Sequence, residues 1–154
     1  MAARKPSEVV AEAVAKFGGG AGNVMQLLTH VNGVLGCVPE EAMREIARAS
    51  GVSSAEIQSV ATFYSFYSLK PRGRHIVRLC KTISCAMKDS EAILSALEKE
   101  LGIGEGGTTP DGRVTLETTN CLGLCDQSPA MLVDEAAYTG LTPEKACEVV
   151  RALE

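Results

Sequence analysis

Four of the six cysteines in this 154-residue chain stand in two closely spaced pairs. Cys80 and Cys85 are separated by four residues, and Cys121 and Cys125 by three. Four thiolates, two on each iron, are the ligand set of a [2Fe-2S] cluster. Because a short spacing lets both members of a pair reach one metal ion, we expect Cys80 and Cys85 on one iron and Cys121 and Cys125 on the other.

Two other uses of paired cysteines remain open on spacing alone. Structural zinc also takes four thiolates in pairs, although its knuckles usually have two residues between the cysteines. Thiol–disulfide exchange is less favoured, because its usual Cys-x-x-Cys motif does not occur in the sequence. The spacing therefore favours an iron–sulfur cluster, with a zinc-stabilised interaction module as the alternative.

The residues between and after the second pair suit a cluster. Gly123 lets the backbone pass close to the sulfurs without a side chain in the way. Leu122, Leu124 and Ala86 are expected to limit the access of water. Asp126 either lowers the reduction potential through its negative charge or serves as a turn residue.

The remaining cysteines and histidines are not expected to do chemistry. Cys37 and Cys147 are predicted to be buried as small apolar side chains. His30 and His75 are the only histidines, and each is expected to be structural or exposed. We predict no catalytic residue on this chain.

Short strands and helices in the second half of the chain would position the two pairs. Residues 75–80 read as a strand that ends at Cys80, and residues 113–118 alternate at the period of a half-buried strand. A helix is predicted over 87–101, a third strand over 130–133, and a last helix from Thr142. The predicted order is β-α-β-β-α, a small sheet covered by helices.

The first seventy residues read as a helical bundle. Ser7 is predicted to cap the first helix and Pro39 to be the first residue of the third. Ser53 and Glu56 form a capping box for the fourth helix. Phe63 and Tyr64, on the fourth helix, are expected to pack in the core. The alternative is that they contact a partner protein. The fold class is thus α+β, with a helical bundle over 1–71 and an α/β domain over 72–154.

Composition narrows the classes of function. Hydrophobic residues make up 45% of the chain, enough for a core that needs no metal in order to fold. Residues 72–154 contain nine Lys and Arg against thirteen Asp and Glu, which argues against nucleic-acid binding. No run of residues is apolar enough to span a membrane, and no signal-peptide core follows the basic start. We expect a cytoplasmic protein.

Taken together, these segments resemble the thioredoxin-like [2Fe-2S] ferredoxin subunits of the complex I NADH-dehydrogenase module. They are also similar to the gamma subunits of NAD(P)-linked, electron-bifurcating [FeFe]-hydrogenases and related formate dehydrogenases. The resemblance rests on Val60-Ala61-Thr62-Phe63-Tyr64-Ser65 in the helical part, on Cys80-x4-Cys85, on the run from Cys121-Leu122-Gly123-Leu124-Cys125 to Met131, and on Leu141-Thr142-Pro143-Glu144.

The resemblance implies a thioredoxin-like domain that holds one [2Fe-2S] cluster on Cys80, Cys85, Cys121 and Cys125. It implies a non-catalytic electron-transfer subunit of a bacterial NAD(P)-linked oxidoreductase. The partners would be a flavoprotein that carries FMN and binds NAD(P), and further iron–sulfur or catalytic subunits. FMN and NAD(P) would bind only to the partner, since this chain lacks a Gly-x-Gly-x-x-Gly motif after a strand. A standalone ferredoxin-like carrier is the alternative.

Overall fold

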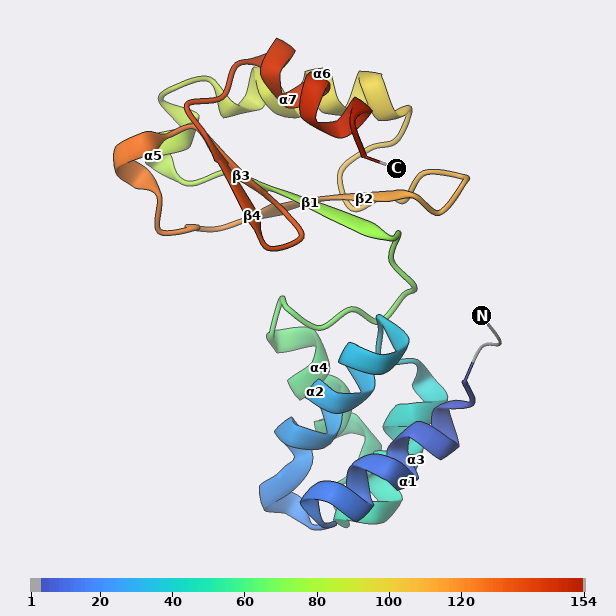
Figure 1. Cartoon of the computed structure of the whole chain (residues 1–154). Coiled ribbons are helices and arrows are strands. Elements are labelled where there is room, and N and C mark those ends of the chain that lie inside the picture. The colour runs from blue at the N-terminus through green and yellow to red at the C-terminus, as the bar shows by residue number, and fades with distance from the viewer. Residues whose placement is uncertain (1–3, 154) are drawn as a thin grey trace. The chain divides into compact units, whose positions relative to one another are not determined.

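The structure is a computed structural model that describes residues 4–153. The chain divides into two compact units, one up to Pro71 and the other from Arg72 onward. Each unit has its own hydrophobic core. Figure 1 shows the helices of the first unit and the sheet and helices of the second.

The first unit is all helical. It consists of α1 (Pro6–Phe17), the short 3-10 helix η1 (Ala21–Asn23), α2 (Val24–Leu35), α3 (Glu40–Ser50) and α4 (Ser54–Phe63). Apolar side chains recur at helical spacing on each helix and meet in one core. The fully buried members of that core include Val9, Leu27, Leu28, Val31, Ile46 and Ile57.

Local signals set most helix ends of this unit, with two differences from the prediction. The Ser53–Glu56 capping box is confirmed, with the Ser53 hydroxyl accepting from the Glu56 backbone N–H. The Ser7 cap is wrong: α1 begins at Pro6, whose fixed φ suits a first helical position and moves the start upstream of Ser7. Pro39 is the N-cap of α3 rather than its first residue.

The end of α4 departs from the expectation of core packing. Phe63 is 79% exposed, and Tyr64 and Phe66 are exposed as well. Their rings stack edge-on or tilted against one another, with the Phe63 and Tyr64 centroids 5.0 Å apart. Tyr67 alone of this aromatic run is buried, and its hydroxyl bonds to Thr29 and to the Met25 carbonyl. The helix ends after Phe63, so its last aromatic residues fall outside the apolar stripe.

The second unit is a four-stranded mixed sheet with two longer helices on one face (Figure 1). The strand order is β2-β1-β3-β4, with β1 parallel to β2 and the other pairs antiparallel. The elements in chain order are β1 (His75–Cys80), α5 (Ile83–Ala86), α6 (Ser90–Leu101), β2 (Val114–Thr119), η2 (Cys125–Gln127), β3 (Ala130–Val133), β4 (Ala136–Thr139) and α7 (Pro143–Arg151).

The predicted α+β class is confirmed, but one helix begins later than predicted and one strand was not predicted. The helix predicted over 87–101 begins only at Ser90, because Asp89 before it adopts a left-handed conformation. The strand β4 was missed, so the order is β-α-β-β-β-α. Val133 pairs with Ala136 across a two-residue turn in which Asp134 has φ 53°. A hairpin turn of this kind needs positive φ, which Asp tolerates.

The core of the second unit lies between the sheet and α6 and α7. Its fully buried members include Val77, Leu79, Leu97, Leu116 and Met131. No helix within residues 4–153 is long and apolar enough to cross a membrane.

The β3–β4 turn carries an ion pair that makes stability depend on pH. The Asp134 carboxylate accepts the Ile76 backbone N–H at 2.8 Å, and His75 Nδ1 lies 2.8 Å from its other oxygen. Burial opposes ionisation of Asp134, but the contacts with His75 and Ile76 outweigh it and hold the pKa of Asp134 below its usual value. The carboxylate therefore stabilises the fold above the unfolded-state pKa of about 4, and this contribution is lost as pH falls through the lower folded pKa.

We accordingly expect Asp134→Asn to lower the free energy of unfolding at pH 7 by roughly 1 kcal/mol. The estimate is at the low end because the Asp134 side chain is 45% exposed to solvent. Asn also tolerates the left-handed conformation, so the turn is kept. Urea unfolding of both proteins at pH 7 and pH 3 checks this. A difference in stability that stays constant between the two pH values would contradict the role of the charge.

Candidate iron–sulfur site

Parallel pairing of β1 and β2 brings the two cysteine pairs to one edge of the sheet. In the register of these strands Cys80 pairs with Thr119, so both strands end side by side. The Lys81 backbone N–H donates to the Thr119 carbonyl at 3.0 Å and extends the ladder by one step. The loop that carries Cys85 and the loop that carries Cys121 and Cys125 therefore leave the sheet from the same end (Figure 1).

The first pair is closed by a turn around Thr82. The Cys85 backbone N–H donates to the Thr82 carbonyl at 2.9 Å, which turns α5 back toward the end of β1. The thiols of Cys80 and Cys85 interact, and this contact adds to burial in raising the pKa of Cys85. Burial opposes ionisation of Cys80, but bonds from Thr82, whose hydroxyl lies 3.1 Å from Cys80 Sγ, and from Cys85 and Leu122 hold the pKa of Cys80 below its usual value.

The second pair lies on the loop after β2. Cys121 Sγ and Cys125 Sγ are 3.5 Å apart, and the Gly123 backbone N–H donates to Cys121 Sγ at 3.3 Å. Gly123 has φ +80°, so the loop needs a glycine there as well as room near the sulfurs. Two sulfurs each about 2.3 Å from a tetrahedral metal stand roughly 3.8 Å apart. The second pair is thus close to the spacing that one metal ion requires.

Contacts also link one pair to the other. The Leu122 backbone contributes to the lowered pKa of Cys80, and the Ser84 side chain opposes the rise in the pKa of Cys125. The pKa of Cys125 is raised, mainly through its contact with Cys121 and with a smaller part from the nearby Cys80. Each loop therefore influences the ionisation of a sulfur on the other loop.

Burial of the two pairs differs sharply. Cys80 and Cys85 are only 2% and 1% exposed, and burial raises the pKa of Cys85. Cys121 and Cys125 are exposed to solvent. Leu122 and Leu124 are half-buried, whereas Ala86 is exposed to solvent. The site thus has an inner pair and an outer pair.

The donor set fits a [2Fe-2S] cluster in its chemistry and pairing. Within residues 4–153 no three His, Cys, Asp or Glu side chains converge on a single point. A [2Fe-2S] cluster needs no such convergence, because each iron takes two thiolates and two sulfides. Two adjacent pairs at one sheet edge are the arrangement that this cluster uses.

Several residues around the pairs escaped the sequence analysis. The hydroxyls of Thr82 and Ser84 reach cysteine sulfurs, and the Lys88 ammonium donates to the Ser128 carbonyl at 3.2 Å. Their positions in the sequence could have indicated these contacts, because Thr82 follows Cys80 by two residues and Ser84 directly precedes Cys85. Asp126 is exposed, and the Gln127 amide donates to it at 3.4 Å.

The other residues singled out in the sequence lie outside the site. Cys37 and Cys147 are buried, as predicted. His75 contacts Asp134 at the opposite end of β1, and His30 lies 3.7 Å from Glu12 in the first unit.

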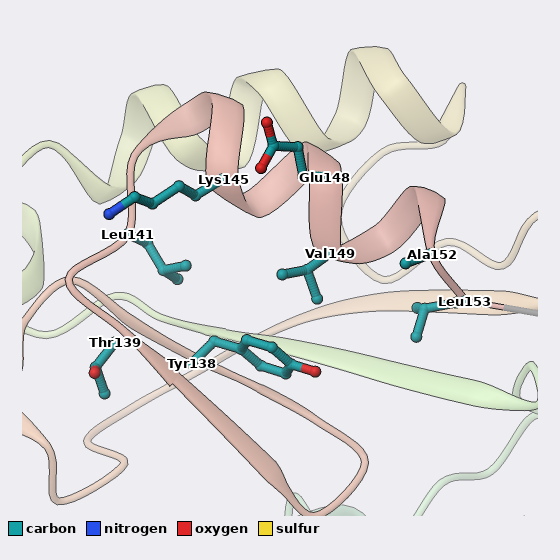
Figure 2. Close-up of a pocket in the computed structure, with 8 residues that line it drawn as sticks. All are labelled: Tyr138, Thr139, Leu141, Lys145, Glu148, Val149, Ala152 and Leu153. Carbon is teal, nitrogen blue, oxygen red and sulfur yellow. The ribbon is translucent and has the colours of Figure 1, made fainter.

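A separate pocket of about 530 Å³ lies between β4 and α7 (Figure 2). Its lining is mostly apolar, with the ring of Tyr138 beneath Val149 and the charged ends of Lys145 and Glu148 at its upper side. None of its lining residues belongs to the two cysteine pairs. It is therefore distinct from the candidate iron–sulfur site.

Proteins of known name are similar to this chain in sequence. The chain is 44% identical over 115 residues to an NADH-quinone oxidoreductase subunit of Escherichia coli K12, covering 75% of this chain and 69% of that protein. It is 34% identical over 129 residues to NADH-quinone oxidoreductase subunit 2 of Thermus thermophilus, covering 84% and 71%.

A solved structure has the same fold over most of the chain. An NAD+-reducing [NiFe]-hydrogenase in the air-oxidised state aligns with a TM-score of 0.71 and 22% identity, over 84% of this chain and 22% of that chain. The sequence profile of the thioredoxin-like [2Fe-2S] ferredoxin family matches residues 10–154, which include all four paired cysteines. This chain belongs to the thioredoxin-like [2Fe-2S] ferredoxin family.

Proposed function

We propose that Cys80, Cys85, Cys121 and Cys125 hold one [2Fe-2S] cluster and that the chain is an electron-transfer subunit of an NAD(P)-linked oxidoreductase. The observation that carries the proposal is the placement of both cysteine pairs at one sheet edge by the parallel β1–β2 register. Membership in a family of [2Fe-2S] ferredoxins favours this cofactor over structural zinc.

When bound, the cluster supplies a one-electron redox couple. The chain's own residues provide its surroundings. Cys80 and Cys85 hold the inner side away from water, since both are buried. The Gly123 backbone N–H donates to Cys121 Sγ and the Leu122 backbone contributes to the lowered pKa of Cys80, so both stabilise negative charge on sulfur. The exposed pair, Cys121 and Cys125, gives electrons a short path to the surface.

The proposed partner is a flavoprotein subunit that carries FMN and binds NAD(P). Two observations support a permanent subunit over a free carrier. The relatives in Escherichia coli and Thermus thermophilus are subunits of NADH-quinone oxidoreductases. The first unit exposes Phe63, Tyr64 and Phe66 together, and adjacent exposed aromatic residues are typical of surfaces that a partner covers.

Anaerobic spectroscopy of the full chain tests both parts of this proposal. We expect about two irons and two sulfides per chain, visible absorption that bleaches with dithionite, and a rhombic EPR signal in the reduced protein. NADH alone is expected to leave the cluster oxidised. NADH together with the organism's FMN-binding subunit is expected to reduce it.

Each arm of this experiment has a contrary outcome. A colourless protein that contains one zinc would replace the cluster with a structural clamp. A cluster that forms but accepts no electrons from NADH through the flavoprotein would leave the chain as a standalone carrier.

A further inference from the structure

Ser128 has a buried hydroxyl that no other described residue satisfies. The residue is 5% exposed, and its Oγ has no hydrogen-bond partner within residues 4–153. A buried hydroxyl without a partner costs about 1–3 kcal/mol. Such groups are rare in folded proteins and call for a partner that the chain itself does not supply.

Ser128 lies in the short segment between Cys125 and β3. It directly follows η2, which begins at Cys125. Two residues further on, the Ala130 backbone N–H donates to the thiol of Cys85. The Ser128 carbonyl accepts from Lys88 Nζ at 3.2 Å, and the Lys88 backbone N–H in turn donates to the Cys85 carbonyl at 3.1 Å. Ser128 therefore lies between the segment of the inner pair and the segment of the outer pair.

The backbone around Ser128 is fixed from its other side too. The Gly140 backbone N–H donates to the Gln127 carbonyl at 2.9 Å, and the Leu141 backbone N–H donates to the Pro129 carbonyl at 3.2 Å. These bonds attach the residues on both sides of Ser128 to the segment after β4. They hold the backbone on both sides of Ser128 in place.

Two other hydroxyls near the cysteine pairs, those of Thr82 and Ser84, contact cysteine sulfurs. The Thr82 hydroxyl lies 3.1 Å from Cys80 Sγ, and the Ser84 hydroxyl contacts the thiol of Cys125. Both therefore have sulfur as a partner. Ser128 differs from them in having no partner among the described protein atoms.

We propose that the Ser128 hydroxyl donates a hydrogen bond to a sulfur of the [2Fe-2S] cluster and so raises its reduction potential. The inference rests on the proposed function, since it requires the cluster. Reduction adds one negative charge to the cluster, and a donor aimed at sulfur stabilises that charge. Ser128 thus changes the reduction potential of the cluster without binding iron.

A redox titration of the full-length holoprotein followed by EPR tests the proposal. We expect Ser128→Ala to keep the cluster and to lower the ratio of reduced to oxidised protein about tenfold at a fixed potential, which is a shift of about 59 mV for a one-electron couple. Ser128→Thr retains the hydroxyl and is expected to restore most of this ratio.

A second readout separates a cluster bond from a purely structural role. In the metal-free chain the Ser128 hydroxyl has no partner, so Ser128→Ala is expected to be as stable as the wild type or more stable in urea. One outcome is that the cluster is present in both proteins while the ratio of reduced to oxidised protein at a fixed potential differs by less than about twofold between Ser128→Ala and the wild type. That result would overturn this inference and leave the proposed function intact. A wild type without a chromophore would overturn the proposed function itself.

Discussion

Replacing Cys85 by alanine is expected to abolish the visible chromophore and to lower the iron content from about two per chain to near zero. Cys85 is one of the inner pair, 1% exposed, and its sulfur contacts Cys80 and the Ala130 backbone N–H. Removal of one thiolate leaves an iron with an incomplete set of ligands. No other cysteine follows it closely, since the next in the sequence is Cys121.

Cys147→Ala is the matched control for this variant. Cys147 is buried too, but it lies on α7, where the charged groups that face it are Glu100, Arg151 and Glu144. Both variants remove one buried thiol, so a general loss of packing would affect both alike. We expect Cys147→Ala to retain its iron and its reduced EPR signal. Full iron content in Cys85→Ala, or equal loss in both variants, would contradict the ligand assignment.

The second large effect concerns the two separate cores. Leu97 on α6 is fully buried in the core of the second unit, and truncation of such a leucine to alanine costs about 2–5 kcal/mol. Because about 1.4 kcal/mol is a factor of ten in an equilibrium constant, Leu97→Ala is expected to lower the protection of amide hydrogens in β1 and α6 by at least about 30-fold. Amides of α2, in the other unit, are expected to keep their protection.

Leu28→Ala provides the mirror experiment. Leu28 on α2 is equally buried, within the core of the first unit. It makes the same change in size, and we expect it to lower protection in α1 to α3 while β1 and α6 stay protected. Hydrogen exchange read by mass spectrometry resolves these segments in one measurement. Equal loss of protection in both units from either variant would mean that the chain opens as one cooperative unit.

The kind of site and most of the helices and strands could be predicted from the sequence. The cysteine spacing and its flanking residues predicted the iron–sulfur family, which is confirmed. The strands at 75–80 and 130–133 were predicted with the bounds that the structure has, because apolar runs between clear turn signals are strong local patterns. The Ser53–Glu56 capping box was readable for the same reason, since its bonds span only three residues.

Local patterns were weakest where distant pairing or solvent exposure decides the outcome. The strand β4, Ala136–Thr139, is only four residues long and begins with two alanines, which are depleted in strands, and β3 pairs with it across the Asp134 turn. Phe63 has a core-type side chain and yet lies 79% exposed, since the end of α4 places it off the apolar stripe.

The amino-acid sequence by itself determined which atoms are available to bind iron, through the types and spacing of four cysteines. Only the tertiary structure decided that the two pairs meet, because the parallel register of β1 with β2 is set by a core of residues far apart in the chain. The same packing decided that one pair is buried and the other exposed, and that the Ser128 hydroxyl is buried. Burial is a property of the whole packed unit, so no local spacing of residues can specify it.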